Sequence, residues 1–176
     1  MRALGRRLAA LLRAGDLVLL TGRLGAGKTT LAQGLGDGLG ARGPVTSPTF
    51  VIARGHPAGP GGLPLAHVDA YRLDSVAEVE DLDLEVSLGE SVTVVEWGEG
   101  KVESLSDDRL EVVIRRSLGA CAAGHAAAAH ATGAHAAGGE GDGARVVELR
   151  GVGDRWSGVD LGLLAAPRGH VSGKCG

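Results

Sequence analysis

A glycine-rich segment, residues 21–30, has the residue types and spacing of a loop that binds phosphate groups. It fits the pattern G-x-x-x-x-G-K-[ST], with the fixed positions filled by Gly22, Gly27, Lys28 and Thr29. Glycines let the backbone aim N–H groups at phosphate oxygens, a lysine ammonium reaches the β- and γ-phosphates, and a threonine hydroxyl ligates Mg²⁺. The pattern therefore predicts a site for a nucleoside triphosphate.

The segments on either side of this loop support the prediction. Residues 16–21 read as a short buried strand, and residues 30–39 can follow as a helix. That context separates a binding loop from an ordinary glycine-rich turn, which is the alternative in a chain with 31 glycines. Lysine is also rare, because only three of the 18 Lys and Arg residues are lysine, so background composition does not explain Lys28. Three glycines inside the helix weaken it, and we expect it to depend on tertiary packing.

Two later strands carry acidic residues at or near their ends. Residues 65–73 predict a strand that contains Asp69, and residues 91–97 predict a strand that ends at Glu96. Hydrolysis of a nucleoside triphosphate needs a carboxylate near Mg²⁺ and a group that positions the attacking water. Each acid alone fits a polar residue at a sheet edge equally well. The two together, downstream of a phosphate loop, favour a catalytic role for at least one of them.

Hydroxyl side chains gather in a loop before a strand expected to begin near Phe50. The hydroxyls belong to Thr46, Ser47 and Thr49. In nucleotide-dependent switches, a segment at this place in the chain senses the γ-phosphate. An ordinary Ser/Thr/Pro turn is an equal alternative.

The remaining segments supply the elements that position the loop and the acids. Leucines at helical spacing predict a helix over residues 1–14 that covers one face of a sheet. Residues 54–64 read as a loop between two strands, in which His56 is expected to be solvated. Residues 109–116 alternate as a half-exposed strand, with residues 145–150 as its hairpin partner.

The last third of the chain carries little pattern. Residues 118–144 are almost all Ala, Gly and His, and we interpret them as a flexible hairpin insertion. Three histidines recur there every five residues, a spacing that does not keep them on one helical face, so a metal site is not favoured. We place the domain at residues 1–156 and leave residues 157–176 as an unassigned tail.

Composition narrows the possible function classes. A length of 176 residues fits one domain, and a net charge of −3 does not indicate direct binding to nucleic acid. Two Trp, one Tyr and one Phe are too few for a base-stacking surface. The two cysteines form no metal spacing or disulfide framework, and no apolar run approaches the ~20 residues that span a bilayer. We therefore expect a cytoplasmic protein that does not enter a membrane.

Four motifs follow one another in a fixed order along the chain. They are L-G-A-G-K-T-T at residues 24–30, T-S-P-T-F at 46–50, H-V-D-A-Y-R-L at 67–73 and V-E-W at 95–97. Together they closely resemble the bacterial TsaE (YjeE) family, small ATPases of tRNA threonylcarbamoyladenosine (t6A) biosynthesis. The likeness spans about residues 1–116. The phosphate loop alone is shared by many families, whereas the ordered combination is specific.

The resemblance implies a fold and a set of site residues. The fold is α/β, a single P-loop NTPase-type domain whose central mixed sheet of parallel and antiparallel strands is flanked by helices. The implied ATP-binding residues are Leu24, Gly25, Ala26, Gly27, Lys28, Thr29 and Thr30. The implied catalytic residues are Lys28, Asp69 and Glu96. Thr29 and Glu96 would ligate Mg²⁺, Thr46, Ser47 and Thr49 would act as a switch, and Trp97 would lie near the nucleotide.

The resemblance also implies partners. Hydrolysis in the family depends on a TsaB–TsaD heterodimer, which transfers a threonylcarbamoyl group to N6 of adenosine 37 in tRNAs reading ANN codons. The ATP cycle of TsaE is expected to reset that complex. TsaE would therefore contact tRNA only indirectly, through the complex. Arg23 departs from the family pattern, which usually has an acidic residue there. This departure changes the charge near the nucleotide.

Other nucleotide-dependent functions would each need sequence features of their own. The chain has no asparagine, so the N-K-x-D motif that reads guanine is excluded. A small-molecule or nucleotide kinase remains an alternative, although the Gly- and Pro-rich loop after Arg54 does not resemble an arginine-bearing lid. A module that holds ATP as a conformational ligand with negligible turnover is the non-enzymatic alternative.

Overall fold

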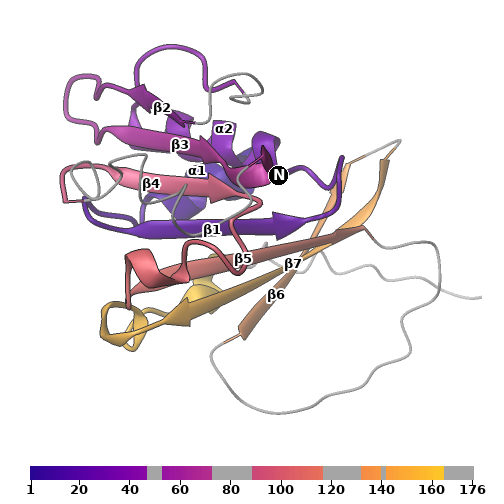
Figure 1. Cartoon of the computed structure of the whole chain (residues 1–176). Helices are drawn as coiled ribbons and strands as arrows, with labels where there is room; N and C mark the ends of the chain where they lie inside the picture. Colours follow the sequence, from indigo (N-terminus) through magenta and orange to yellow (C-terminus); the bar gives the residue numbers. More distant parts are fainter. Residues whose placement is uncertain (47–52, 73–88, 117–131, 140–141, 165–176) are drawn as a thin grey trace, which may run out of the picture.

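A mixed β-sheet forms the frame of the protein (Figure 1). The computed structural model describes residues 1–46, 53–72, 89–116, 132–139 and 142–164. Its strands are β1 (Leu17–Gly22), β2 (Ala53–His56), β3 (Leu65–Asp69), β4 (Val92–Glu96), β5 (Arg109–Arg116), β6 (Thr132–Gly139) and β7 (Asp142–Val152). Within these described residues the sheet has seven strands in the order β2-β3-β4-β1-β5-β7-β6. The four central strands from β3 to β5 are parallel, and β2, β7 and β6 are joined by antiparallel pairing.

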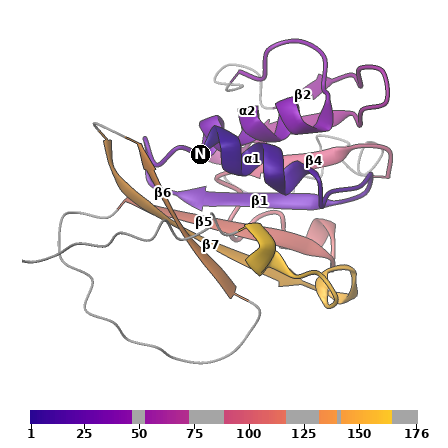
Figure 2. The same ribbon diagram turned by 180° about the vertical axis from the view of Figure 1, so that it is seen from behind.

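Two helices cover one face of this sheet. They are α1 (Arg2–Ala9) and α2 (Lys28–Leu39), and both lie in front of β3, β4 and β1 in Figure 2. The first helix ends at Ala9, earlier than the residue 14 expected from the leucine spacing. Single-turn 3₁₀ helices complete the described chain as η1 (Ala70–Arg72), η2 (Glu103–Leu105), η3 (Asp154–Trp156) and η4 (Leu161–Leu164). None of the helices in the described residues is long and apolar enough to cross a membrane.

Glycines in α2 bring the two helices into close contact. A Cβ on Gly34 would collide with the carbonyl oxygen of Arg2, and one on Gly38 would lie 2.9 Å from that of Arg6. At the exposed edge of the contact, Asp37 of α2 accepts hydrogen bonds from Arg2 at 2.7 Å and from Arg6 at 2.9 Å. The hydrogen bond from Arg2 lowers the pKa of Asp37. The glycines that reduce helix propensity therefore permit the tertiary contact on which α2 depends.

Gly34→Ala is expected to destabilise the protein, although alanine is the better helix former. Alanine gains up to about 1 kcal/mol of propensity, but overpacking against a helix backbone typically costs about 1–3 kcal/mol. We expect a net loss of about 1–2 kcal/mol in the free energy of unfolding, measured by urea denaturation. Gly158→Ala is the control, because a Cβ there meets no atom within 4 Å. An unchanged urea midpoint for Gly34→Ala would contradict the close contact.

The expected antiparallel pairing of residues 109–116 with residues 145–150 is confirmed, but the two strands are not a simple hairpin, because β6 lies between them in the chain. β5 spans Arg109–Arg116, and Leu110, Val112 and Ile114 are buried while the residues between them are partly exposed. It pairs antiparallel with β7 over its whole length. The strand β6, which pairs with the other side of β7, had no signal in the sequence, because residues 132–139 are Ala, Gly, Thr and His without alternation.

The chain after β7 packs into the same core as the helices. Trp156, Leu161 and Leu164 are buried there, at 3%, 3% and 4% exposure. A Cβ on Gly151 would collide with the Cβ of Trp156, so glycine is required where the indole crosses β7. Residues 157–164, which the sequence left unassigned, therefore belong to the folded unit.

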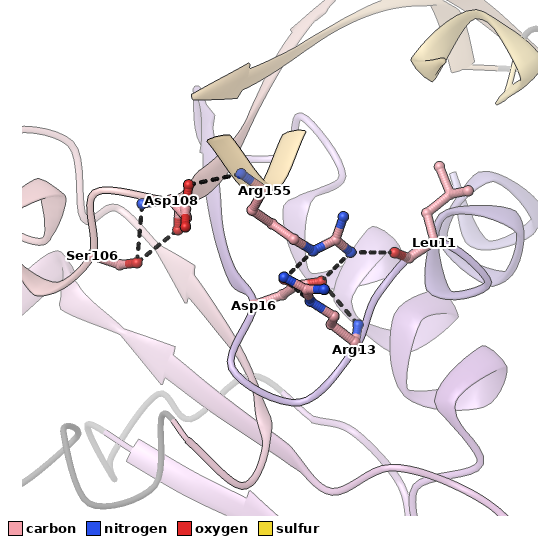
Figure 3. Close-up of polar contacts among 6 residues, drawn as sticks. All are labelled: Leu11, Arg13, Asp16, Ser106, Asp108 and Arg155. Atoms are coloured by element: carbon pink, nitrogen blue, oxygen red, sulfur yellow. Dashed lines mark hydrogen bonds and ion pairs between the residues drawn. The ribbon is translucent and has the colours of Figure 1, made fainter. Parts of the chain in front are cut away.

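A buried arginine ties this C-terminal segment to the start of β1 (Figure 3). The Arg155 guanidinium donates from Nε and Nη2 to the two carboxylate oxygens of Asp16, both at 2.9 Å, and from Nη2 to the carbonyl oxygen of Leu11 at 2.7 Å. The Arg155 backbone N–H donates to Oδ1 of Asp108 at 3.0 Å. The side chains of Arg155 and Asp16 are only 10% and 4% exposed.

The prediction for residues 54–64 is partly wrong. Residues 54–56 lie in β2, which pairs antiparallel with β3, so the connecting loop begins only at residue 57. His56 is buried, at 5% exposure, and is not solvated as expected. It pairs in register with Leu65, and side chains of paired residues lie on the same face of a sheet. Burial lowers the pKa of His56, and neighbouring His67 lowers it further.

Candidate functional site

The carboxyl ends of three parallel strands meet at one edge of the sheet. The register places Asp69 at the end of β3 beside Glu96 at the end of β4, and Glu96 beside Leu20 in β1. The glycine loop, residues 22–29, follows β1 directly (Figure 1). Ligands of open α/β sheets bind at this edge of the strands. The fold therefore brings both predicted acids and the predicted phosphate loop to one place.

The glycine loop has the backbone conformation that its sequence requires. Gly25 and Gly27 have φ angles of 73° and 107°, in the left-handed region that favours glycine. Gly27 is the N-cap of α2, and no side chain caps this end of the helix. The first N–H groups of a helix lack partners within the helix and carry partial positive charge. This end of α2 therefore suits an anion.

Lys28 lies buried in the glycine loop, with 4% exposure. Its Nζ donates to the carbonyl oxygens of Gly22 at 2.6 Å and Arg23 at 3.3 Å, and lies 3.6 Å from the ring centroid of Trp97. Burial lowers the pKa of Lys28, and the carboxylates at the strand ends offset part of this effect. The side chain of Arg23, the residue that departs from the family pattern, is exposed. Arg23 contacts Lys28 through its backbone carbonyl oxygen.

Glu96 is the most enclosed acid of the site, with 3% exposure. Its Oε2 accepts a hydrogen bond from Oγ1 of Thr29 at 3.1 Å. Its Oε1 lies 2.9 Å from Nε2 of His67. The two residues predicted to ligate Mg²⁺ are thus in direct contact. Sequence patterns assigned no role to His67, although it is the first residue of the H-V-D-A-Y-R-L motif, two residues before Asp69.

Asp69 and Trp97 lie around this centre. Asp69 is half-buried, and its Oδ1 accepts the backbone N–H of Tyr71 at 3.1 Å. The Tyr71 ring meets Trp97 edge-on, with centroids 5.3 Å apart. Trp97 has a φ of 63°, which is uncommon for a residue other than glycine and frequent at functional sites. Trp97 covers Lys28 from this position.

Other predicted residues are placed less centrally. Leu24 is 87% exposed and Thr30 is exposed, whereas Ala26 is buried beneath the loop. Thr46 is exposed, and its Oγ1 accepts a hydrogen bond from Nη1 of Arg54 at 2.9 Å. Ser47 and Thr49 lie outside the described residues, so the switch segment stays a prediction.

Two residues without any signal in the sequence lie against the glycine loop. Arg145 of β7 donates from Nε to the carbonyl oxygen of Ala26 at 2.9 Å. A Cβ on Gly27 would lie 3.1 Å from Cγ of Met1 and 3.6 Å from Nε of Arg145. Burial lowers the pKa of the Met1 amine, and the positive charges of Arg145 and Arg7 lower it further. Positive charge thus accumulates beside the start of α2.

Comparison with known proteins decides the family. The family model described as "Threonylcarbamoyl adenosine biosynthesis protein TsaE" matches residues 1–120. The chain belongs to the TsaE family. A relative from Streptomyces coelicolor, named tRNA threonylcarbamoyladenosine biosynthesis protein TsaE, is 57% identical over 166 residues, which cover 94% of this chain and 99% of that protein. A TsaE protein from Bacillus subtilis is 43% identical over 117 residues, covering 66% and 72%.

A solved structure confirms the fold expected for a TsaE protein. The crystal structure of YdiB from Bacillus subtilis is similar with a TM-score of 0.59 and 31% identity, and the match covers 88% of this chain and 80% of that one. The single α/β domain with a mixed sheet was thus predicted correctly. Membership of the TsaE family makes the chain a protein of tRNA threonylcarbamoyladenosine biosynthesis.

The site of this TsaE-family chain extends beyond the region matched by the family model. That match ends at residue 120, whereas Arg145 comes from β7. The contact joins Arg145 to a residue 119 positions away along the chain. No local motif can report such a contact, which explains why sequence patterns missed it.

Proposed function

We propose that this TsaE-family protein binds and hydrolyses ATP as an accessory component of tRNA threonylcarbamoyladenosine biosynthesis. The observation that carries the proposal is the contact of Thr29 with Glu96 below the glycine loop, at 3.1 Å, with Lys28 beside them. This arrangement joins a phosphate-binding loop, a lysine and a carboxylate in the combination that nucleoside triphosphate hydrolysis needs.

The side chains of the site fit Mg²⁺. Thr29 and Glu96 supply hard oxygen donors from α2 and β4. Within the described residues, no group of three or more His, Cys, Asp or Glu could hold a metal ion on its own. Two protein oxygens fit Mg²⁺, which usually keeps several waters and binds substrate phosphates. When bound, Mg²⁺ would neutralise charge on the phosphates of ATP.

Each residue of the site would have a separate role in ATP hydrolysis. Lys28 would exchange the carbonyl oxygens of Gly22 and Arg23 for phosphate oxygens, while the N–H groups at the start of α2 orient the phosphate chain. Asp69, half-buried beside Glu96, would position the attacking water. The absence of asparagine excludes the usual guanine-reading motif, which agrees with ATP as the proposed nucleotide.

The proposal includes a place of action and a partner. A TsaB–TsaD-type heterodimer would stimulate hydrolysis in the cytoplasm, and the complex would modify adenosine 37 in tRNAs reading ANN codons. Contact with tRNA would be indirect, since the net charge of −3 gives no general attraction to nucleic acid.

Phosphate release measured with and without partners tests this proposal. Adding purified TsaB and TsaD to the protein with ATP and Mg²⁺ should raise the rate of phosphate release at least about tenfold, equivalent to ~1.4 kcal/mol of transition-state stabilisation. The Lys28→Ala variant with the same partners should release no more than the partners alone. Tight ATP binding without stimulated release would instead identify a non-enzymatic binding module. Transfer of the phosphoryl group to an acceptor would identify a kinase.

A further inference from the structure

A fully buried histidine faces the candidate metal ligand. His67 lies in β3 with 0% exposure, and its Nε2 is 2.9 Å from Oε1 of Glu96 in the neighbouring strand. The pairing register places His67 beside Val94, two residues before Glu96. A carboxylate accepts hydrogen bonds and donates none when ionised, so Nε2 carries the proton in this bond.

The two oxygens of Glu96 have different partners. Oε1 contacts His67, and Oε2 accepts from Thr29. The terminal torsion of a glutamate is broad, so one hydrogen bond alone leaves the carboxylate plane poorly defined. The bond from His67 occupies one oxygen and directs the other toward Thr29 and the glycine loop.

Packing alone does not account for a histidine at this position. On the same sheet face the buried neighbours of His67 are Leu65 along β3 and Val94 across in β4, while the exposed Arg54 is its partner in β2. A leucine would fill the buried part of this place without polar atoms. Nδ1 of His67 is buried without a hydrogen-bond partner among the described residues. Burying an unpaired polar atom costs free energy. The bond to Glu96 is what offsets that cost.

We propose that His67 is a positioning residue that holds the Glu96 carboxylate in the orientation needed to receive Mg²⁺ or its water beside Thr29. This inference rests on the proposed function. Residues that orient a metal ligand typically change metal affinity about 10- to 100-fold when they are replaced.

The test compares ATP affinity in excess Mg²⁺ with ATP affinity in EDTA, measured by calorimetry on the full-length chain. The dissociation constant in EDTA divided by that in Mg²⁺, here the Mg²⁺ ratio, reports the contribution of Mg²⁺ to binding. Its measurement needs no turnover. His67→Leu should keep the wild-type affinity in EDTA but lower this ratio about tenfold. His67→Gln, which retains an N–H donor, should restore much of the ratio. Glu96→Gln is the reference for loss of the carboxylate.

His56→Leu is the matched control. His56 is also a buried histidine with an unpartnered ring nitrogen, but no hydrogen bond joins it to Glu96. It should leave the Mg²⁺ ratio unchanged. Should His67→Leu fail to fold, as judged by its melting transition, His67→Met takes its place under the same criteria, because methionine fills irregular space.

The outcomes separate this inference from the proposed function. A wild-type Mg²⁺ ratio in folded His67→Leu, with a lowered ratio in Glu96→Gln, overturns the role of His67 and leaves the proposed function standing. An equal loss in His56→Leu also overturns it, because the effect would then be general to the buried histidines. Failure of the wild-type protein to bind ATP overturns both.

Discussion

Lys28→Ala is expected to lower ATP affinity about 100-fold or more while the protein stays folded. Hydrogen bonds to charged groups contribute about 1.5–3 kcal/mol each, so loss of two contacts to phosphate oxygens gives this magnitude. Lys28 lies at the start of α2, within the glycine loop, and is one of three lysines in the chain. Calorimetric titration with ATP and Mg²⁺ measures the affinity, and circular dichroism checks the fold.

Lys101→Ala is the matched control for this variant. Nζ of Lys101 also donates to a backbone carbonyl, that of Ala70, at 3.0 Å, but Lys101 lies outside the glycine loop. Its replacement removes the same charge from a half-buried position outside the glycine loop, so ATP affinity should change less than about threefold. Equal affinities of Lys28→Ala and the wild type would remove the glycine loop from nucleotide binding.

Arg155→Ala is expected to lower the free energy of unfolding by about 3–5 kcal/mol, because it leaves the buried Asp16 carboxylate without its main partner. The ion pair is bidentate and both side chains are almost fully buried, as Figure 3 shows for the contacts of Arg155. The indole of Trp156 also lies 4.5 Å from the guanidinium carbon. Urea denaturation followed by circular dichroism measures the loss.

Arg13→Ala provides a control that shares the same carboxylate. Nε of Arg13 is 3.9 Å from Asp16, and its side chain is 69% exposed. Exposed ion pairs contribute about 0–1 kcal/mol, so this variant should remain close to the wild type. Replacing Asp16 together with Arg155 by apolar residues should recover part of the lost stability, because no buried charge is then left unpaired. A loss below about 1 kcal/mol in Arg155→Ala would show that the pair is not structural.

The sequence predicted those parts of the site that depend on spacing along the chain. The glycine loop, its strand and its helix are contiguous, and the acids Asp69 and Glu96 each end a short apolar run. Parallel strands gather their carboxyl ends at one edge, so local patterns and one rule of topology were enough to bring these residues together.

The residues that were missed depend on contacts between distant segments. His67 gains its role only through the register of β3 with β4, and Arg145 only because β7 runs past the glycine loop. His56 was misplaced because Gly and Pro after it suggested a loop, whereas pairing with β3 extends the strand and buries the ring. Composition alone does not determine where such a strand ends.

The position of Trp97 connects the site with a measurable signal. Its ring lies 3.6 Å from the Lys28 ammonium, so movement of that ammonium toward a phosphate would change the environment of the indole. The second tryptophan, Trp156, is buried in the core with the helices and lies outside the site. Tryptophan fluorescence of a Trp156→Phe variant therefore reports on Trp97 alone, the tryptophan beside Lys28.

Titration of the wild-type protein with ATP in the presence and absence of Mg²⁺ tests the central claim most directly. We predict saturable binding of one ATP per chain that is tighter with Mg²⁺ than with EDTA and is about 100-fold or more weaker in Lys28→Ala. Absence of ATP binding, or binding that neither Mg²⁺ nor Lys28 affects, would contradict the account.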